Sequence, residues 1–363
     1  MTKQQLRALW FQIHKWLGLT LAILIIPISL SGAVLVWHEE IEGLLHPQRE
    51  VTAVASLPPS AYATAALKQA GPKEKLASLA FKPKGGPVVA TLTSPPPQPG
   101  ARPTRTTLYL HPQDARLLDK ASSSGGFLQT LHVLHGSLMV PGVGRQIVGW
   151  VGVAMLLSSL TGLWLWWPIK GSVTRGLRWR RNPTTSGNLH YQSGFWICLP
   201  LAVLSFTGAW ISFPAFFAGV SGDPAVPSMA ERMRRMGAQP MVETKLTAEQ
   251  AATLGSGGGP LTQITWPTSP KSEWQLTRIG GTQVIVNDRT GRASPPKPPA
   301  PETTARLMRR IHDGTGLPMV WRVIIFVGGI LPALLAITGV MMWLNVRRRR
   351  SDMAVRRGTL RTA

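Results

Sequence analysis

Four long apolar stretches, separated by more polar sequence, constrain this chain more than any other feature. They run at about Trp16–Trp37, Arg145–Trp167, His190–Phe213 and Trp321–Leu344. Each matches the ~20 residues with which an α-helix crosses a bilayer. Their interiors carry almost no charge, and tryptophan stands at several ends, as is typical of the lipid–water interface. The sequence therefore predicts four membrane-spanning helices.

Landmarks around these stretches occur twice at a nearly constant interval. Three pairs are 177 residues apart (312−135, 322−145 and 339−162), and two pairs are 176 apart (190−14 and 208−32). The matched residues are His135 and His312, Arg145 and Arg322, Gly162 and Gly339, His14 and His190, and Gly32 and Gly208. Repetition at one interval indicates an internal duplication. We therefore expect two copies of one unit, in which a spanning helix, a polar insert and a second spanning helix follow one another.

Positive charge is concentrated in the short segments that flank the apolar stretches. The chain has 39 Lys and Arg against 16 Asp and Glu, a net charge of +23 that by itself would suggest a nucleic-acid partner. The basic residues of the short connection and the tail are Lys170, Arg175, Arg178, Arg180, Arg181, Arg347–Arg350, Arg356, Arg357 and Arg361. Basic residues in short flanking segments mark the cytoplasmic side of a membrane. We therefore expect both termini in the cytoplasm, the long inserts outside, and contact with lipid and not with nucleic acid.

The predicted fold class is a mainly α membrane protein, in which a tandem two-helix duplication forms a bundle of four transmembrane helices and carries two small α+β inserts. The expected boundaries are 1–37 for the N-terminus and first span, 38–130 for the first insert, 131–167 for an interfacial segment and the second span, 168–189 for a cytoplasmic loop, 190–213 for the third span, 214–305 for the second insert, 306–346 for an interfacial segment and the fourth span, and 347–363 for the basic tail. The Pro141–Gly144 break predicts a short interfacial helix around His135, separate from the second span.

Each insert shows a helix followed by short strands. The predicted elements are a helix at Ser60–Ala70 with strands at Pro87–Thr93 and Thr106–Leu110, and a helix at Thr247–Leu254 with strands at Gln263–Trp266, Trp274–Arg278 and Gln283–Val286. Neither insert carries a nucleophile beside a base, a glycine-rich phosphate loop or paired acids that would indicate catalysis. Cys198 is the single cysteine, which excludes an intrachain disulfide and a cysteine-based metal site. The chemistry is therefore expected in or near the membrane.

Four of the eight histidines belong to the duplication, and these are the candidate functional residues. Ionisable side chains at membrane depth are costly and usually functional, although a single histidine at a helix end is often only interfacial. Parallel repeats pack about an axis along the membrane normal. Symmetry would then bring His14 opposite His190 near the cytoplasmic side, and His135 opposite His312 near the outer side. Facing imidazoles in a helix bundle suit the two axial positions of a haem iron. Zinc fits less well, because no carboxylate or cysteine accompanies them in the membrane.

Charged and small residues near these histidines admit two interpretations. Arg145 and Arg322 can neutralise haem propionates at the outer surface, or they can simply extend to the interface. The repeat glycines, together with Gly18 and Gly194, can make room for a flat ring or permit close helix packing.

The remaining histidines have no counterpart in the second copy. His132 lies one turn before His135 and is an alternative ligand for the outer haem. His38, at the end of the first span, can reach the same haem. His46 and His111 are expected on surface loops.

Several motifs recur across nearly the whole chain. They are HKWLG, LHGSLMVPGVGRQIVG, TGLWLWWP, NLHYQSG, IHDGTGLP and the closing TG–MMWL–RRRR, with HPQDARLL and NDRTGRA in the inserts. On these motifs the chain resembles the PepSY-associated transmembrane family, which includes iron-regulated inner-membrane proteins and ferric-siderophore reductases, and the inserts resemble divergent PepSY domains. The resemblance implies two b-type haems on the positions that match the family histidines, His14, His135, His190 and His312. His38 and His132 fall outside the common pattern.

The resemblance implies a function as well as a fold. We expect an oxidoreductase of the bacterial inner membrane that passes electrons to a periplasmic ferric siderophore and releases Fe(II), with no individual catalytic residue assigned. Because the chain has no nicotinamide or flavin fingerprint, the electrons would come from a quinol or a cytoplasmic reductase. Two alternatives stay open: a non-redox membrane protein whose PepSY-like domains bind a partner or peptidase, and a di-haem protein that reduces another acceptor, such as copper or a quinone.

Overall fold

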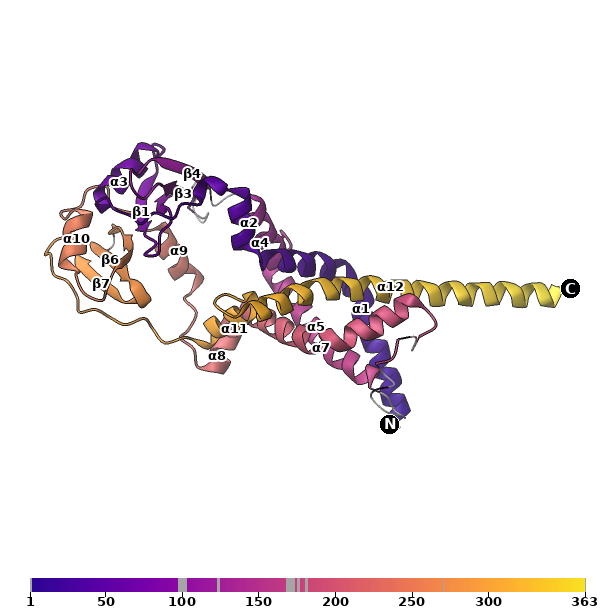
Figure 1. The fold of residues 1–363 in the computed structure, drawn as a ribbon. Helices are drawn as coiled ribbons and strands as arrows, with labels where there is room; N and C mark the ends of the chain where they lie inside the picture. Colours follow the sequence, from indigo (N-terminus) through magenta and orange to yellow (C-terminus); the bar gives the residue numbers. More distant parts are fainter. Residues whose placement is uncertain are drawn as a thin grey trace. The chain divides into compact units, whose positions relative to one another are not determined.

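The computed structural model describes residues 2–96, 103–122, 125–167, 174, 177–179, 182–269 and 271–362, without the side chains at 229, 236 and 354–362. The described residues are mostly helical, with four helices long and apolar enough to cross a membrane and one antiparallel sheet (Figure 1). The chain divides into two compact units. The helical unit comprises Met1–His38, Thr130–Val226 and Glu302–Ala363, and the sheet unit comprises Glu39–Gln129 and Pro227–Pro301.

The four candidate spans are continuous helices. They are α1 (Lys3–Leu35), α5 (Gly144–Trp166), α7 (Thr185–Ser212) and α12 (Met319–Thr362). Polar caps satisfy backbone groups where two of them begin. Thr2 and Gln5 form a reciprocal capping box at α1, and the Thr184 hydroxyl accepts from the backbone of Gly187 at α7. All four predicted spans are therefore present as helices, and α1 begins well before the predicted Trp16.

Each span packs against two others within the helical unit. Helices α1 and α7 both pack against α5 and α12, so α1 and α7 lie diagonally opposite one another. Their shared core contains Ile25, Val151, Ile197 and Ala336, one from each span. Side chains of α1 and α7 can therefore meet across this core.

Shorter helices precede or follow the spans along the chain. They are α2 (His38–Leu45), α4 (Phe127–Ser137), α8 (Pro214–Ser221) and α11 (Thr304–Asp313). Between α4 and α5 the chain turns through Leu138 and Met139, whose φ angles are 51° and 59°, and through Gly142 at 75°. These left-handed conformations cannot continue a helix. The predicted break before the second span is confirmed.

Both inserts contribute to the sheet unit. Its strands are β1 (Lys75–Ala80), β2 (Val88–Thr93), β3 (Arg105–Leu110), β4 (Leu117–Ser122), β5 (Leu261–Thr265), β6 (Glu273–Arg278) and β7 (Gln283–Asn287). The order across the sheet is β4-β3-β2-β1-β5-β6-β7, with every neighbouring pair antiparallel. At the centre, β1 of the first insert pairs with β5 of the second, with Leu79 opposite Ile264. Each insert thus covers the other's exposed strand edge.

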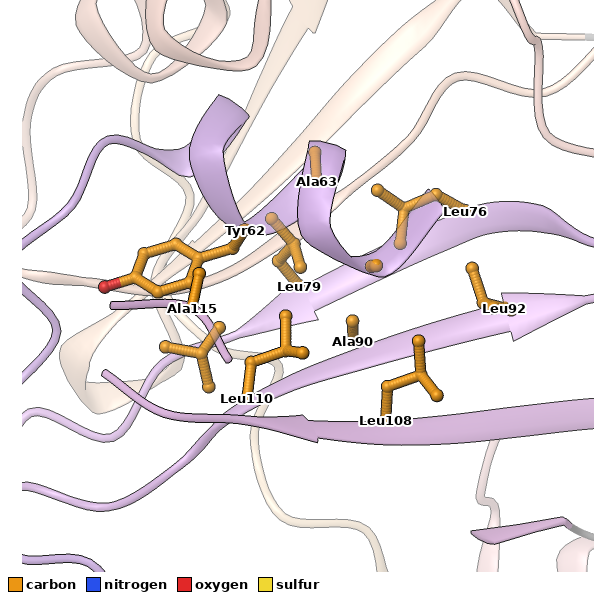
Figure 2. Close-up of a cluster of buried hydrophobic side chains, with 11 residues drawn as sticks. Tyr62, Ala63, Leu76, Leu79, Ala90, Leu92, Leu108, Leu110 and Ala115 are labelled. Carbon is orange, nitrogen blue, oxygen red and sulfur yellow. The ribbon is translucent and has the colours of Figure 1, made fainter. Parts of the chain in front are cut away.

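Each half of the sheet carries its own helix. Figure 2 shows Tyr62 and Ala63 of α3 (Pro59–Lys68) lying over Leu79, Leu108 and Leu110. In the second half, α10 (Ala248–Leu254) covers β5–β7 in the same way. A further helix, α9 (Met229–Gly237), and two short 3₁₀ turns, Pro47–Arg49 and Ile279–Gly281, complete the sheet unit.

Two aromatic side chains join the two halves. Phe81 follows β1 and Trp266 follows β5, and each packs against the apolar cores of both halves. The inserts were predicted as two separate α+β domains, and this is the main difference from the sequence prediction: they share one sheet, and Phe81 and Trp266 join their two apolar cores. The compact sheet unit also takes only Pro227–Pro301 from the predicted range 214–305.

The individual elements of the inserts match the sequence prediction closely. Helices α3 and α10 and strands β2, β3, β5, β6 and β7 lie within two residues of the predicted ends. Strands β1 and β4 were not predicted. Their sequences, KLASLA and LLDKAS, contain no β-branched or aromatic residue that would favour a strand.

Several of the basic residues used to predict orientation lie, wholly or with their side chains, outside the described part of the chain. These are Lys170, Arg175, Arg180 and Arg181, and the side chains of Arg356, Arg357 and Arg361. The cytoplasmic placement of these segments stays a prediction.

Candidate functional site

The duplicated histidines lie in two pairs inside the helical unit. His14 on α1 and His190 on α7 have ring centroids 6.3 Å apart and ring planes at 82°. His135 on α4 and His312 on α11 have centroids 6.0 Å apart and planes at 40°. We call these the α1–α7 pair and the α4–α11 pair. The structure thus brings together the same partners that the duplication suggested.

Threonine hydroxyls orient the α1–α7 pair. His14 Nδ1 lies 3.1 Å from Thr161 Oγ1, and His190 Nδ1 lies 3.0 Å from Thr338 Oγ1. Each hydroxyl also donates to the backbone carbonyl four residues earlier in its own helix, at 2.8 and 2.7 Å. A hydroxyl has one hydrogen, so it accepts from the imidazole, and Nδ1–H is the donor. The helix backbone therefore fixes the tautomer of each ring through the threonine.

The α4–α11 pair is oriented in a similar way. His135 Nδ1 lies 2.8 Å from the carbonyl oxygen of Ile28. His312 Nδ1 lies 3.0 Å from Thr207 Oγ1 and 3.1 Å from the carbonyl oxygen of Leu204. Because a carbonyl can only accept, Nδ1–H again donates. In all four histidines the lone pair is then on Nε2, and within the described part of the chain nothing hydrogen-bonds to that atom.

Each imidazole lies against a helix at a glycine. A Cβ added at the glycine would lie 2.7 to 3.5 Å from Cε1 of the ring. The contacts are Gly32 with His135, Gly162 with His14, Gly208 with His312, and Gly339 with His190. These four glycines make room for imidazoles, a role that neither interpretation included. Gly18 has no atom within 4 Å of such a Cβ, and Gly194 only Leu335 Cδ2, at 3.7 Å.

Burial keeps the α4–α11 pair neutral. It lowers the pKa of His135, nearby His132 lowers it further, and the hydrogen bond that His135 donates to the Ile28 carbonyl acts in the opposite direction. Burial, with His135 adding to it, lowers the pKa of His312 to about 4. Both rings are therefore neutral near pH 7, the form in which imidazole binds metals.

The two pairs lie near opposite ends of the spans. Gly32, which contacts His135, is 18 residues after His14 on α1 (32−14), and Gly208, which contacts His312, is 18 residues after His190 on α7 (208−190). At 1.5 Å per residue this is about 27 Å along the helix. The separation is close to the ~30 Å thickness of a hydrocarbon core.

The spacing within each pair fits two ligands on opposite sides of one metal ion. With metal–nitrogen bonds of about 2 Å and about 1.1 Å from nitrogen to ring centre, opposed imidazoles have centres about 6.2 Å apart, whereas a tetrahedral angle would bring them to about 5 Å. The observed 6.3 and 6.0 Å match the opposed arrangement. No group of three or more His, Cys, Asp or Glu side chains in the described residues could hold a metal. A planar macrocycle that supplies the other four ligands therefore fits these residues better than a bare zinc ion does.

The two repeat arginines bond to the ends of spans. The Arg145 guanidinium donates to the carbonyl of Ile211 in the last turn of α7. Arg322 donates to the carbonyl of Val36, just after α1, at 2.7 Å and lies 4.7 Å from the Trp37 ring centroid. Both satisfy carbonyls that a helix leaves without a partner. Their contact with haem propionates stays a prediction.

The other histidines lie outside the two pairs. His38 and His132 have ring centroids 6.4 Å apart and form a further pair. In the sheet unit, His46 lies 3.3 Å from Asp119, and His111 lies 3.1 Å from Asp114. Neither of these two belongs to the candidate site.

Comparison with known families agrees with this architecture. The family model for the PepSY-associated TM region matches residues 11–345. The chain belongs to the PepSY-associated transmembrane family. The match includes all four duplicated histidines and both inserts, so this family assignment extends over the helical and sheet units alike. A search of curated proteins found no match to the chain.

In this PepSY-associated transmembrane protein, the sequence prediction assigned no role to the hydroxyl residues that precede the repeat glycines. Thr161, Thr207 and Thr338 each precede a repeat glycine, and each bonds to a duplicated histidine. Ser31 stands at the fourth such position, where its hydroxyl bonds to the backbone carbonyls of Pro27 and Ile28. A hydroxyl residue before every repeat glycine was the signal that could have identified them.

Proposed function

We propose that this protein is a haem-containing reductase of the bacterial inner membrane, which passes electrons across the membrane to a periplasmic ferric siderophore. The proposal rests on the α1–α7 and α4–α11 histidine pairs, whose ring centroids are 6.3 and 6.0 Å apart. In all four histidines Nδ1–H donates a hydrogen bond. Metal-ligating histidines typically donate their second ring nitrogen to such a partner.

His14 and His190 would hold one b-type haem, and His135 and His312 would hold the second. Haem bound there would supply one-electron transfer at a potential set by its axial ligands and by burial. Threonine hydroxyls hold His14, His190 and His312 in one tautomer and orientation, and the Ile28 carbonyl does so for His135. Arg145 and Arg322 would supply positive charge beside the α4–α11 pair.

The overall reaction is balanced by one electron for each iron. A ferric chelate accepts one electron and its iron leaves as Fe(II), which hard oxygen ligands hold less tightly. The electron comes from a quinol or a cytoplasmic reductase. The basic residues of the loop and tail support cytoplasmic termini and periplasmic inserts.

We further infer that the helical unit arose by tandem duplication of a two-helix segment. The support is that contacts repeat at the sequence interval. His14 contacts Gly162 on α5 as His190 contacts Gly339 on α12, and both steps are close to 177 residues (190−14=176, 339−162=177).

The deciding experiment is spectroscopy of the purified full-length protein. The absorption spectrum should show bis-histidine b-type haem, and the pyridine haemochrome assay should give at least two haems per chain, one for each duplicated pair. Dithionite-reduced protein, freed of excess reductant and mixed anaerobically with ferric siderophores, should be reoxidised as a ferrous chelator captures Fe(II).

Variants connect this result to the residues. H14A should remove one haem and H135A the other, whereas H111A, which removes an imidazole from the sheet unit, should keep both. A colourless preparation, from cells supplied with haem, would remove the redox function and leave a binding role for the PepSY-like inserts. Reoxidation by Cu(II) or a quinone, with no reaction of ferric chelates, would instead indicate a different acceptor.

A further inference from the structure

A third histidine pair lies in the helical unit, outside the two duplicated pairs. His38 begins α2 and His132 lies on α4, and their ring centroids are 6.4 Å apart with planes at 80°. The spacing exceeds those of the other pairs by only 0.1 and 0.4 Å (6.4−6.3 and 6.4−6.0). It matches the ~6.2 Å of opposed imidazole ligands and not the ~5 Å of tetrahedral ones.

The hydrogen bonding of His38 repeats the pattern of the duplicated histidines. His38 Nδ1 lies 3.0 Å from the carbonyl oxygen of Leu35, the last residue of α1. Carbonyls in the last turn of a helix lack an intrahelical partner, so this one accepts from Nδ1–H. The lone pair of His38 is then on Nε2, the atom available to a metal. Metal-binding histidines are ordinarily oriented in this way, by a hydrogen bond from the ring nitrogen that does not bind the metal.

The third pair belongs to the first half of the chain alone. Adding the repeat intervals to the two positions gives residues 214 (38+176) and 309 (132+177), which are Pro214 and Arg309. Neither can replace an imidazole ligand. The pair is therefore not a relic of the duplicated sites.

Access also separates this pair from the others. His132 is exposed and His38 is half-buried. His132 precedes His135 by three residues on α4, about 4.5 Å along the helix axis. A group bound between His38 and His132 would therefore lie beside the α4–α11 pair and be reachable from solvent.

We propose that His38 and His132 form a third transition-metal site, in which two imidazoles bind opposite positions of one metal. The shared chemistry is bis-imidazole ligation, and the metal comes either from an iron porphyrin or from a free ion that favours nitrogen ligands, such as copper. The site stands apart from the proposed function, because a free ion can bind there whether or not the duplicated pairs hold haem.

The first arm of the test counts haem in the full-length protein purified in detergent. A porphyrin at this site gives one haem more than the duplicated pairs hold, and H38A and H132A each remove that haem. The control is H46A, which removes one imidazole from the sheet unit. H132Q, which keeps a polar side chain, repeats the test should H132A fail to fold, as judged by gel filtration and circular dichroism.

The second arm titrates the same proteins with Cu(II). A free-ion site binds one equivalent whose electron paramagnetic resonance spectrum shows coupling to two nitrogens. Its affinity falls at least tenfold in H38A and in H132A, and not in H46A. The double variant H38A/H132A loses no second equivalent, because both residues serve one ion.

Loss of a haem in H38A and H132A supports a porphyrin site, and loss of Cu(II) affinity in the same variants supports a free-ion site. The proposal is overturned if haem content is the same in H38A, H132A and H46A and all three bind Cu(II) as the unaltered protein does. A preparation without haem but with the Cu(II) site intact would refute the proposed reductase and leave this inference standing.

Discussion

Replacing Gly32 with alanine tests whether the repeat glycines are there to accommodate imidazoles. A Cβ at Gly32 would lie 2.7 Å from Cε1 and 3.0 Å from Nδ1 of His135. Ordinary contact begins near 3.4 Å, so the ring must move by about 0.7 Å (3.4−2.7). The ring is not free to move, because its Nδ1 is bonded at 2.8 Å to the carbonyl of Ile28.

The cost follows from these distances. A shift of 0.7 Å lengthens that hydrogen bond to roughly 3.5 Å, at the limit of hydrogen bonding, and its loss costs about 1 kcal/mol. Overpacking adds about 1–3 kcal/mol, and the better helix propensity of alanine returns up to about 1 kcal/mol. We expect G32A to be destabilised by roughly 1–3 kcal/mol.

Two other glycines serve as matched comparisons. A Cβ at Gly339 would lie 3.5 Å from Cε1 of His190, which is ordinary contact, and one at Gly136 has nothing within 4 Å. G339A and G136A should therefore unfold at or slightly above the temperature of the unaltered protein.

The measurement is thermal unfolding of the purified proteins, followed by circular dichroism at a helix wavelength. At about 2–4 °C for each kcal/mol, the midpoint of G32A should fall by several degrees. If G32A and G339A unfold at the same temperature, a Cβ at Gly32 does not destabilise the protein, and Gly32 is not needed to accommodate the imidazole of His135.

Three further predictions test the orienting hydrogen bonds, the sheet unit and the joined cores. T161V removes the bond to His14 Nδ1 and should weaken haem retention at that site about tenfold, measured as haem loss to apomyoglobin, while T161S should keep it. Asp288 accepts two backbone N–H groups and an indole N–H. Burial alone would raise the pKa of its carboxyl, but these donors hold that pKa below its usual value. A carboxyl whose pKa is lower in the folded state stabilises the fold at pH values above its unfolded-state pKa, and this stabilisation is lost as the pH falls. D288N should therefore destabilise the sheet unit by about 1–3 kcal/mol at pH 7 and by less at pH 3, as measured by denaturant titration. F81A, at a residue shared by both cores, should increase hydrogen exchange in the strands of both inserts, and exchange confined to the first insert would contradict a shared core.

Local patterns in the sequence predicted much of this structure. An apolar run of twenty residues has few alternatives to a spanning helix, and the Pro141–Gly142 turn separates α4 from α5 as expected. The alternation of apolar and polar residues in β6 (Glu273–Arg278) matches its alternating burial. The pairing of histidines followed from one arithmetic interval.

The joining of the inserts was not predictable from such patterns. Pairing of β1 with β5 connects residues nearly two hundred positions apart, such as Leu79 and Ile264. The local alternation of apolar and polar residues does not reveal which distant strand a strand pairs with. β1 has only two leucines to mark it, and both are buried. Its place at the centre of the sheet depends on neighbours from both inserts and not on intrinsic strand preference.

The hydroxyl–glycine dipeptides show how one short motif can hold an imidazole against a helix. The glycine lets the ring approach the backbone. The preceding threonine uses its single hydrogen on its own helix, so that it can only accept from the ring. That leaves Nε2 of His14, His190 and His312 as the lone-pair nitrogen, independent of any bound metal. A threonine-to-valine change keeps the shape and removes only the acceptor. We expect T338V to release the imidazole proton of His190 from Nδ1, and T207V to leave that of His312 in place, because His312 also donates to the carbonyl of Leu204. If nitrogen NMR of labelled histidine showed the proton of His190 still on Nδ1 in T338V, the hydroxyl would not determine the tautomer of that ring.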